Sequence, residues 1–255
     1  MKVVILAGGY GSRLSEETLV KPKPLVEIGG IPILLHIMKY YASFGFKDFI
    51  ICCGYKGSEI KNYFLNYQKL LYDIEISLSD NSIKYMNSHP EDWNIQLIDT
   101  GQDTMTGGRI KRIREYLNPG ETFALTYGDG LTDAQLDKEL LFHKTNKKLA
   151  TVLGVNIPTR FGTLSVRNGI ATSFREKPED NNLISGGYFF LNESIIDLIK
   201  DDDSIFEQEP LQWLANNNEL AVFEHRKFWQ PMDTLKEKQY LEELWNEGRA
   251  PWCKV

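Results

Sequence analysis

The stretch "LAGGYGSRLSEETLVKPKPLVEIGG", residues 6–30, decides the fold and follows a short apolar run. That run, Val3 to Leu6, predicts a buried strand, and the glycines after it predict a loop with exposed peptide N–H groups. Arg13 then supplies a fork of donors that suits phosphate, and Lys23 lies between two prolines that restrict its backbone. The pattern favours a phosphate-binding loop at a strand end. The alternative is an ordinary turn with surface cations.

Two common phosphate-binding motifs are absent from this stretch. A dinucleotide-binding fingerprint, G-x-G-x-x-G, that begins at Gly9 would require glycine where the sequence has Leu14. A P-loop that begins at Gly8 would require a Gly-Lys pair, but Arg13 follows instead. The sequence therefore argues against a nicotinamide oxidoreductase, and a phosphate site here must rest on bare backbone and fixed cations.

The composition is typical of a globular protein without a nucleic-acid or membrane partner. The chain has 255 residues, of which 42% are hydrophobic and 25% charged, and its net charge of −6 argues against nucleic-acid binding. No run approaches the ~20 apolar residues of a membrane helix, and no signal-peptide pattern precedes the first strand. Three cysteines, two of them adjacent, predict neither a disulfide framework nor a zinc site. We expect a reduced, cytoplasmic protein.

Apolar strand-like runs alternate with helical patterns along the chain. The predicted strands lie at 2–6, 48–53, 74–78, 95–99, 123–127, 150–155, 187–191 and 221–225. The clearest helical patterns lie at 32–45, 107–117 and 234–248. The alternation predicts a single α/β domain over residues 1–255, with a mostly parallel sheet covered by helices on both faces. A smaller antiparallel portion is expected after residue 150.

Ligands of such sheets bind beyond the carboxyl ends of the strands, so the residues there are candidates for a site. Five of the predicted strands are followed by glycine, by an acidic residue or by both. The glycines are Gly8, Gly9, Gly11, Gly54, Gly57, Gly101, Gly107, Gly108, Gly128 and Gly130, and the acidic residues are Asp129 and Asp233. Their recurrence at one edge predicts a polar ligand held against the main chain.

Residues 6–30 also resemble the signature of the sugar-nucleotide pyrophosphorylases, which join a nucleoside triphosphate to a sugar 1-phosphate. Further segments, in order and over nearly the whole chain, are similar to the glucose-1-phosphate cytidylyltransferase branch of that family. They are "FIICCGYKG", "DTGQDTMTGGRIKR", "TYGDGLTD", "RFGTLSV", "FREKPED", "SGGYFFLN", "EQEPL" and "FWQPMDT". The resemblance implies a Rossmann-like nucleotidyltransferase fold. It also implies transfer of a cytidylyl group from CTP to α-D-glucose 1-phosphate, which yields CDP-glucose and pyrophosphate.

The residues fit this reaction without a covalent intermediate. A sugar phosphate oxygen attacks the α-phosphorus while pyrophosphate leaves in line, so the protein needs positioning and positive charge rather than a nucleophile. No Ser-His-Asp or Cys-His constellation is convincing, and His36, in an apolar helix, is interpreted as structural. The resemblance assigns catalysis to Arg13, Lys23 and Asp129. Arg13 would bind the β- and γ-phosphates, and Lys23 would neutralise charge at the α-phosphate.

Asp129 and Asp233 are the candidate metal ligands. Two carboxylates that converge on one Mg²⁺, with phosphate oxygens completing the shell, commonly hold a nucleotide–metal complex. From the residues alone, Asp129 is equally consistent with a turn between glycines, and Asp233 with the N-cap of the helix that starts near Leu235. The resemblance favours metal binding, because both positions match aspartates of the family.

The resemblance divides the candidates between the two substrates. The nucleotide is expected to contact Leu6, Gly8, Gly9, Gly11, Ser12, Arg13, Lys23, Gly54, Tyr55, Thr106, Gly107, Gly108 and Arg109. The sugar phosphate is expected to contact Gly128, Gly162, Glu176, Lys177, Gly187 and Tyr188. Simpler interpretations exist for some of them: Glu176 and Lys177 as a solvated turn, Tyr188 as an inward-facing strand residue, and Arg109 as a solvated helix cation. Ser185 stands where relatives have asparagine, which leaves the hexose preference open.

The base is the least constrained part of the prediction. The glycine loop and its cations bind phosphates that all nucleotides share, so UTP and dTTP remain alternatives to CTP. CTP rests on the resemblance at "GYKG" and "MTGG", with Tyr55 or Met105 expected to line the base pocket. A non-catalytic regulator on this scaffold should have lost a charged residue, but the whole charged set is present.

The resemblance also implies self-association, because the family commonly forms homo-oligomers. Trp245 and Trp252 lie near the C-terminus, where they predict either a subunit contact or packing on their own domain. The implied product is a precursor of CDP-linked deoxysugars in surface polysaccharide, including lipopolysaccharide O-antigen.

Overall fold

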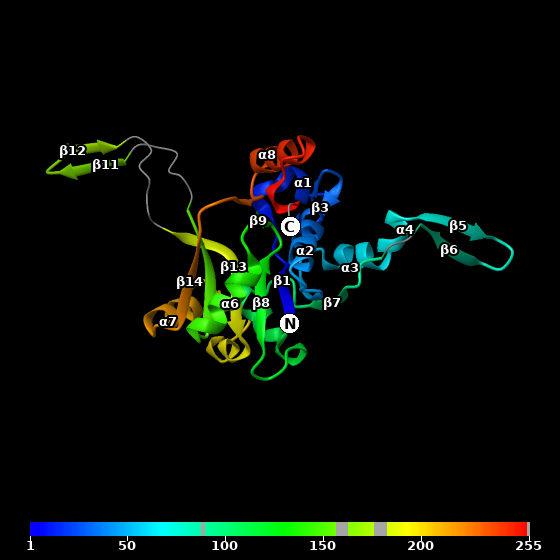
Figure 1. Ribbon diagram of the computed structural model, residues 1–255, viewed down its shortest axis with the longest axis horizontal. Coiled ribbons are helices and arrows are strands. Elements are labelled where there is room, and N and C mark those ends of the chain that lie inside the picture. Colours follow the sequence, from blue (N-terminus) through cyan, green and yellow to red (C-terminus); the bar gives the residue numbers. More distant parts are fainter. Residues whose placement is uncertain (88–89, 157–162, 176–182, 254–255) are drawn as a thin grey trace.

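The computed structural model describes residues 1–87, 90–156, 163–175 and 183–253, and its centre is a seven-stranded sheet (Figure 1). The strands are β1 (Lys2–Leu6), β4 (Asp48–Cys53), β7 (Asn94–Asp99), β8 (Thr122–Tyr127), β10 (Ala150–Val155), β13 (Ile184–Asn192) and β14 (Leu220–His225). Their order across the sheet is β14-β10-β13-β8-β1-β4-β7. β13 is antiparallel to β8 and β10, and the other neighbours are parallel. The predicted mostly parallel α/β sheet is confirmed.

Helices cover both faces of the sheet, because alternate residues of each strand point to opposite sides. The longer helices are α2 (Ile33–Ser43), α3 (Gly57–Leu65), α5 (Thr106–Arg112), α6 (Leu136–Asn146), α7 (Glu209–Asn216) and α8 (Leu235–Asn246). Val3 of β1 packs in a core cluster with α2, α6 and α8, whereas Val4 packs in a second cluster with α5 and α7. The adjacent Cys52 and Cys53 of β4 divide in the same way: Cys52 joins the cluster of Val4 and Cys53 that of Val3.

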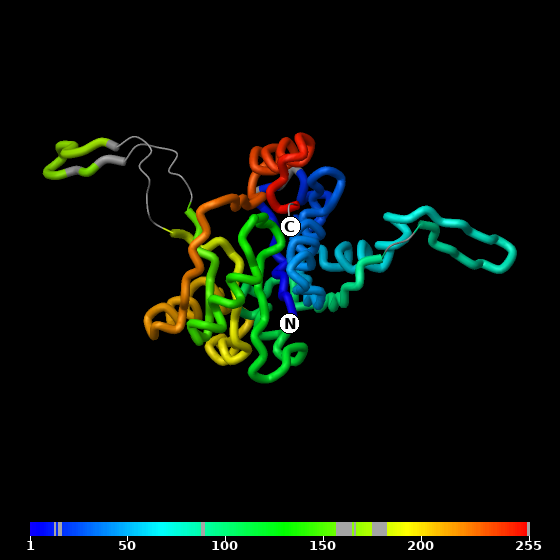
Figure 2. Tube along the Cα trace, in the orientation of Figure 1, coloured from blue at the N-terminus to red at the C-terminus, as the bar shows by residue number. Residues whose placement is uncertain are grey.

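The remaining elements are short, and two hairpins among them stand away from the sheet (Figure 2). The hairpins are β5 (Asp73–Ser77) with β6 (Ser82–Met86), and β11 (Thr163–Arg167) with β12 (Ile170–Arg175). The other short elements are η1 (Ser12–Leu14), α1 (Ser15–Thr18), η2 (Lys23–Leu25), β2 (Glu27–Ile28), β3 (Ile31–Pro32), α4 (Tyr67–Leu71), η3 (Arg114–Tyr116), β9 (Gly130–Thr132), η4 (Glu193–Leu198), β15 (Trp229–Pro231) and η5 (Pro251–Cys253). The strand expected at 74–78 therefore belongs to a separate hairpin. Among the described helices, none has the length and apolar character to cross a membrane.

Thr234, rather than Asp233, caps the N-terminus of α8. The Thr234 hydroxyl accepts a hydrogen bond from the Glu237 N–H at 3.3 Å, and the Glu237 carboxylate accepts one from the Thr234 N–H at 2.9 Å. This reciprocal capping box satisfies the first turn of the helix. The N-cap interpretation of Asp233 is therefore wrong.

Trp245 and Trp252 pack on their own domain. Trp252 is buried, its Nε1 donates to His36 Nδ1 at 3.1 Å, and the ring of Phe228 stacks on it. Trp245 lies against Gly29, where a Cβ would come within 1.9 Å of the indole nitrogen. Burial lowers the pKa of His36, as expected for a structural histidine. These tryptophans therefore give no support to a subunit contact.

Candidate active site

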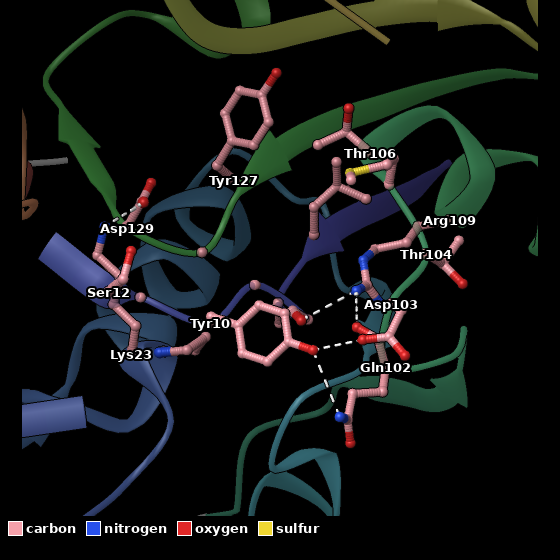
Figure 3. A pocket seen from close by; sticks show the side chains of 18 of the residues that line it. Tyr10, Ser12, Lys23, Gln102, Asp103, Thr104, Thr106, Arg109, Tyr127 and Asp129 are labelled. Atoms are coloured by element: carbon pink, nitrogen blue, oxygen red, sulfur yellow. Dashed lines mark hydrogen bonds and ion pairs between the residues drawn. The ribbon is translucent and has the colours of Figure 1, made fainter. Parts of the chain in front are cut away.

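A cavity of about 420 Å³ opens at the carboxyl ends of β1 and β8, beside the first turn of α5 (Figure 3). The following residues of the predicted site line it: Leu6, Gly8, Gly9, Gly11, Ser12, Lys23, Thr106, Arg109, Gly128, Asp129 and Asp233. The strand-end rule therefore points to this cavity from the sequence. Since the glycine loop, the two aspartates and four cationic or hydroxyl side chains meet here, we take it as the candidate active site.

The loop after β1 presents its main chain to the cavity. A Cβ at Gly9 would meet no atom within 4 Å, so this residue has open space beside it. Gly11 has a φ of +64°, in the left-handed region that favours glycine, and a Cβ there would press on Thr18 and Lys23. The Thr18 hydroxyl donates to the Gly11 carbonyl at 3.1 Å, which ties the loop to α1. The side chain of Arg13 lies outside the described part of the structure.

Lys23 lies between the two candidate metal ligands. Its Nζ donates to Asp129 Oδ2 at 2.7 Å and to Asp233 Oδ1 at 2.6 Å. The Met232 N–H donates to the Asp129 carbonyl at 2.8 Å, which holds the two acidic segments side by side. Burial by itself lowers the pKa of Lys23, but the two carboxylates outweigh burial and raise the pKa above its ordinary value. Lys23 therefore stays positively charged at neutral pH.

The same two carboxylates suit a divalent metal ion. Carboxylate oxygens are the hard donors that Mg²⁺ prefers, and the two here already contact one cationic group. Across the described residues, no group of three or more His, Cys, Asp or Glu side chains could hold a metal. Mg²⁺ is usually bound by one or two carboxylates together with substrate phosphates and water. Asp129 and Asp233 fit that pattern.

Arg109 is buried on the other side of the cavity from Asp129 (Figure 3). Its guanidinium donates to the carbonyls of Gly8, Cys53, Gly101 and Gln102 and to the hydroxyl of Thr100, over 2.7–3.3 Å. These acceptors follow or end β1, β4 and β7, so one side chain joins three strand ends. Burial lowers the pKa of Arg109, yet a guanidinium stays charged in proteins. The interpretation of Arg109 as a solvated helix cation is therefore wrong.

Gly8 and Gly54 make room for the Arg109 guanidinium. A Cβ at Gly8 would lie 2.3 Å from Arg109 Nη1, and a Cβ at Gly54 would lie 2.4 Å from the same atom. Gly54 and Tyr55 were assigned to the nucleotide, but neither lines the cavity. The Tyr55 N–H donates to the Gly8 carbonyl at 3.1 Å, and its ring lies 4.8 Å from that of Tyr10. In this structure Gly54 therefore leaves space for Arg109, and Tyr55 contacts the loop at Gly8 and Tyr10.

Gly107 and Gly108 also lie outside the cavity lining. A Cβ at Gly107 would lie 2.6 Å from the Ser204 carbonyl oxygen, and one at Gly108 would lie 2.5 Å from the backbone of Asp202. The Gly107 N–H donates to the Ser204 carbonyl at 2.9 Å. The two glycines thus let α5 approach the segment 201–204. The sequence resemblance predicts that the nucleotide contacts both glycines, whereas in this structure both pack against segment 201–204.

The sugar-phosphate candidates fall into three groups. Gly128 lines the cavity, and Gly187 has a φ of +74° against a neighbouring tyrosine ring. Tyr188 is 1% exposed and its hydroxyl donates to the Gly130 carbonyl at 2.7 Å, so it is the inward-facing strand residue of the simpler interpretation. Gly162, Glu176 and Lys177 lie outside the described residues.

Several lining residues were missing from the predicted site: Ala7, Tyr10, Pro24, Gln102, Asp103, Thr104 and Tyr127. Met105, expected in the base pocket, also lines the cavity. The Tyr10 hydroxyl donates to Asp103 Oδ1 at 2.5 Å, and this hydrogen bond raises the pKa of Tyr10 (Figure 3). Most of these side chains end or follow a predicted strand. The strand-end rule, applied to all residue types, would have found them.

Comparisons with known proteins show which family the chain is similar to. Residues 2–242 match the nucleotidyl transferase family model. The chain is 54% identical to the glucose-1-phosphate cytidylyltransferase of Salmonella typhimurium, over 99% of this chain and 98% of that protein. It is 30% identical to the mannose-1-phosphate guanyltransferase of Yarrowia lipolytica, over 94% of this chain and 62% of that protein. The structure of UDP-glucose pyrophosphorylase complexed with UDP-glucose matches with a TM-score of 0.70 at 15% identity, covering 97% of this chain and 99% of that one.

Proposed function

The chain belongs to the nucleotidyl transferase family, and we propose that it transfers the cytidylyl group of CTP to α-D-glucose 1-phosphate, releasing pyrophosphate. The observation that carries the proposal is Lys23 held between Asp129 and Asp233 in the cavity beside the glycine loop. A charged lysine and two carboxylates beside open main chain are suited to a nucleoside triphosphate and its metal ion. The identity of 54% to a cytidylyltransferase over nearly the whole chain supports the choice of reaction.

In the proposed reaction, the residues of the chain bind and orient the substrates. A sugar phosphate oxygen forms a bond to the α-phosphorus, and the bond from that phosphorus to the pyrophosphate oxygen breaks with its electrons leaving on pyrophosphate. Lys23 would neutralise charge at the α-phosphate, and Arg13 would bind the leaving phosphates. The open main chain at Gly9 and the hydroxyl of Ser12 would fix the phosphates in line.

Asp129 and Asp233 would hold Mg²⁺ in this proposal. The ion would supply positive charge that offsets the phosphate oxygens and favours the departure of pyrophosphate. Turnover should therefore stop in excess EDTA and return when Mg²⁺ is added back. Full turnover in EDTA would show that the two aspartates serve another purpose.

The candidates for binding the sugar phosphate come from the sequence between residues 162 and 188. We propose Lys177 as the ligand of its phosphate, Glu176 as acceptor for sugar hydroxyls, and Gly162 and Gly187 as positions that leave room for the hexose. The support is the similarity of "RFGTLSV", "FREKPED" and "SGGYFFLN" to the cytidylyltransferase branch. Replacing Lys177 with methionine should raise the KM for the sugar phosphate much more than the KM for the nucleotide. Equal losses would place Lys177 elsewhere.

The choice of CTP must come from groups that meet the edge of the base. Cytosine presents an amino donor at N4 and an acceptor at N3, whereas uracil and thymine present the reverse pair. A buried polar site that matches one edge rejects the other by orders of magnitude, because the wrong base leaves groups unpaired. We propose that groups lining the cavity read the base edge: the side chains of Gln102, Asp103 and Met105 and the main chain at Gly8.

A pyrophosphate-release assay tests the whole proposal. CTP, UTP, dTTP and GTP should be compared at equal concentration, each with glucose 1-phosphate and with several other sugar 1-phosphates. We expect CTP with glucose 1-phosphate to give the fastest release. Faster pyrophosphate release with UTP or dTTP would favour the alternative uridylyl- or thymidylyltransferase. No release from any pair would favour a nucleotide-binding regulator.

The cellular role follows from the product. CDP-glucose would be made in the cytoplasm as a precursor of CDP-linked deoxysugars of surface polysaccharide, including lipopolysaccharide O-antigen. Growth of a strain lacking the gene, followed by analysis of its polysaccharide sugars, tests this role.

We also propose that the chain self-associates through residues 65–86, which we call the arm. Eight of the exposed large hydrophobic side chains lie in the arm: Leu65, Leu70, Leu71, Ile74, Ile76, Leu78, Ile83 and Met86. In the β5–β6 hairpin, Ile76 lies opposite Ile83 and Ile74 opposite Tyr85, so one face is apolar. A two-stranded hairpin is marginally stable alone, and such a face is typical of an interface. Light scattering should report a mass above that of the 29.3 kDa monomer. The double substitution Ile76→Ser and Ile83→Ser should lower the measured mass.

A further inference from the structure

The Lys23 ammonium has two possible sets of partners in the candidate site, the two carboxylates and the phosphates of a bound nucleotide, and it cannot pair fully with both at once. In this structure two of its three N–H donors are directed to Asp129 and Asp233, at 2.7 and 2.6 Å. The proposed reaction asks the same ammonium to neutralise the α-phosphate and asks the same carboxylates to hold a divalent cation. The arrangement of the free chain and the arrangement needed for transfer are therefore different.

The surroundings explain why Lys23 takes this place in the free chain. Its side chain is 12% exposed, and those of Asp129 and Asp233 are 31% and 26% exposed. Two partly buried carboxylates held side by side repel each other unless a cation lies between them. The two flanking prolines restrict the backbone of Lys23, but four flexible methylene groups still let its ammonium move.

We propose that Lys23 is a tethered substitute for the divalent cation, occupying its carboxylates until the metal–nucleotide complex enters and then turning to the phosphates. This inference rests on the proposed magnesium site at Asp129 and Asp233. It assigns to Lys23 a positioning task in the free chain, in addition to its task at the α-phosphate. The exchange keeps the carboxylates paired at every stage.

A consequence is coupling between metal and nucleotide. A divalent ion that arrives alone must displace a cation that is covalently attached to the site, so its affinity is lowered. When nucleotide arrives with it, the displaced ammonium gains phosphate oxygens as new partners, so the displacement is offset. The nucleotide should therefore raise the affinity of the site for the metal. By thermodynamic linkage, the metal should raise the affinity for the nucleotide by the same factor.

The first test measures the binding of Mg²⁺ alone by isothermal titration calorimetry, without nucleotide. Lys23→Met removes the competing ammonium and keeps the stem, so the Kd for Mg²⁺ should fall about tenfold relative to the unaltered chain. The matched control is Lys21→Met, because Lys21 lies two residues away and pairs with the exposed Glu27 at 2.8 Å. Its Kd should change less than about twofold. A Kd in Lys23→Met that is unchanged or higher, or no binding to either protein, would overturn the inference.

The second test uses the unaltered chain, so it stands even if the Lys23 variant folds poorly. Lysine residues are modified by reductive methylation, and the rate at each position is read by mass spectrometry with and without Mg²⁺. Lys23 should react slowly in the free chain and several-fold faster with saturating Mg²⁺, while Lys21 should not change. An unaltered rate at Lys23 with Mg²⁺ bound would show that the ammonium does not leave the carboxylates.

These outcomes are separate from those that test the function. If transfer of the cytidylyl group fails but Lys23→Met binds Mg²⁺ more tightly, the exchange at the site stands without the proposed substrate. If transfer succeeds and Lys23→Met shows no gain, the reaction stands and the substitute role of Lys23 is wrong.

Discussion

Lys23 and Arg109 are two cations of one cavity, but the protein holds them in opposite ways. Lys23 is paired with two carboxylates, so a stronger cation is able to take its place. Arg109 is buried, and its guanidinium donates to four main-chain carbonyls, so its removal breaks several buried hydrogen bonds at once. The difference shows which part of the cavity can change its partners. Near Asp129, the lysine ammonium and a metal ion can exchange at the carboxylates. Near Arg109, the guanidinium holds three loops in place.

The largest loss of activity is expected from a substitution at the carboxylates that pair with Lys23. Asp129→Asn removes a charge that both Lys23 and the proposed metal require, so kcat should fall by about a thousandfold. The fold should survive, because Asp129 lies at the cavity rather than in the core. Steady-state kinetics with a circular dichroism check measures both. Asp92→Asn is the control, because Asp92 is 72% exposed and pairs with Lys47, and neither residue lines the cavity. Turnover near that of the control would contradict the role of Asp129.

Breaking the fixed side should mainly cost stability. Arg109→Met removes the buried guanidinium whose hydrogen bonds join carbonyls at three strand ends, and we expect the free energy of unfolding to fall by about 3 kcal/mol. Arg112→Met, on the same helix, removes a guanidinium whose ion pair with Asp202 is exposed, so its effect should stay within about 0.5 kcal/mol. Urea denaturation of both variants measures the difference. Equal losses would mean that burial of Arg109 has no special importance.

Substitutions at the adjacent Gly8 and Gly9 distinguish two roles of the loop, namely its packing against Arg109 and its contact with the ligand. Gly8→Ala forces a Cβ onto the Arg109 guanidinium and should lower the free energy of unfolding by about 1–2 kcal/mol. Gly9→Ala points into open space and should leave stability within about 0.5 kcal/mol of the unaltered chain. If phosphates approach the main chain at Gly9, this second variant should still bind CTP several-fold more weakly. Thermal unfolding and CTP titration together decide, and a stable Gly8→Ala protein would remove the steric argument.

The smallest effect is expected at the mouth of the cavity. Tyr10→Phe deletes the hydroxyl that donates to Asp103, but Tyr10 is 48% exposed and water replaces the lost partner. The KM for CTP should change less than about threefold. Spectrophotometric titration of the phenols should lose one group with a raised pKa, because the hydrogen bond to Asp103 raises the pKa of Tyr10. A tenfold change in KM would place this hydroxyl on the nucleotide.

The sequence predicted elements and strand ends well, because both depend on local patterns. Asp129 lies two residues after a predicted strand, so its place at the cavity could be inferred from the sheet type alone. The role of Arg109 could not, because its acceptors come from three strand ends that meet only in the folded chain. Gly107 shows the limit of composition: glycine indicates a close approach without naming the partner, which here is Ser204.

The alternation of side chains on β4 has a consequence for thiol chemistry. Cys52 and Cys53 are sequence neighbours, but the sheet itself separates their sulfur atoms into different core clusters. Burial raises the pKa of both thiols, that of Cys53 to about 11, so neither forms appreciable thiolate at neutral pH. Cys253 is exposed near the C-terminus. A thiol-reactive dye should therefore attach at Cys253 alone, giving a single reporter position and leaving the sheet and the candidate active site chemically unaltered.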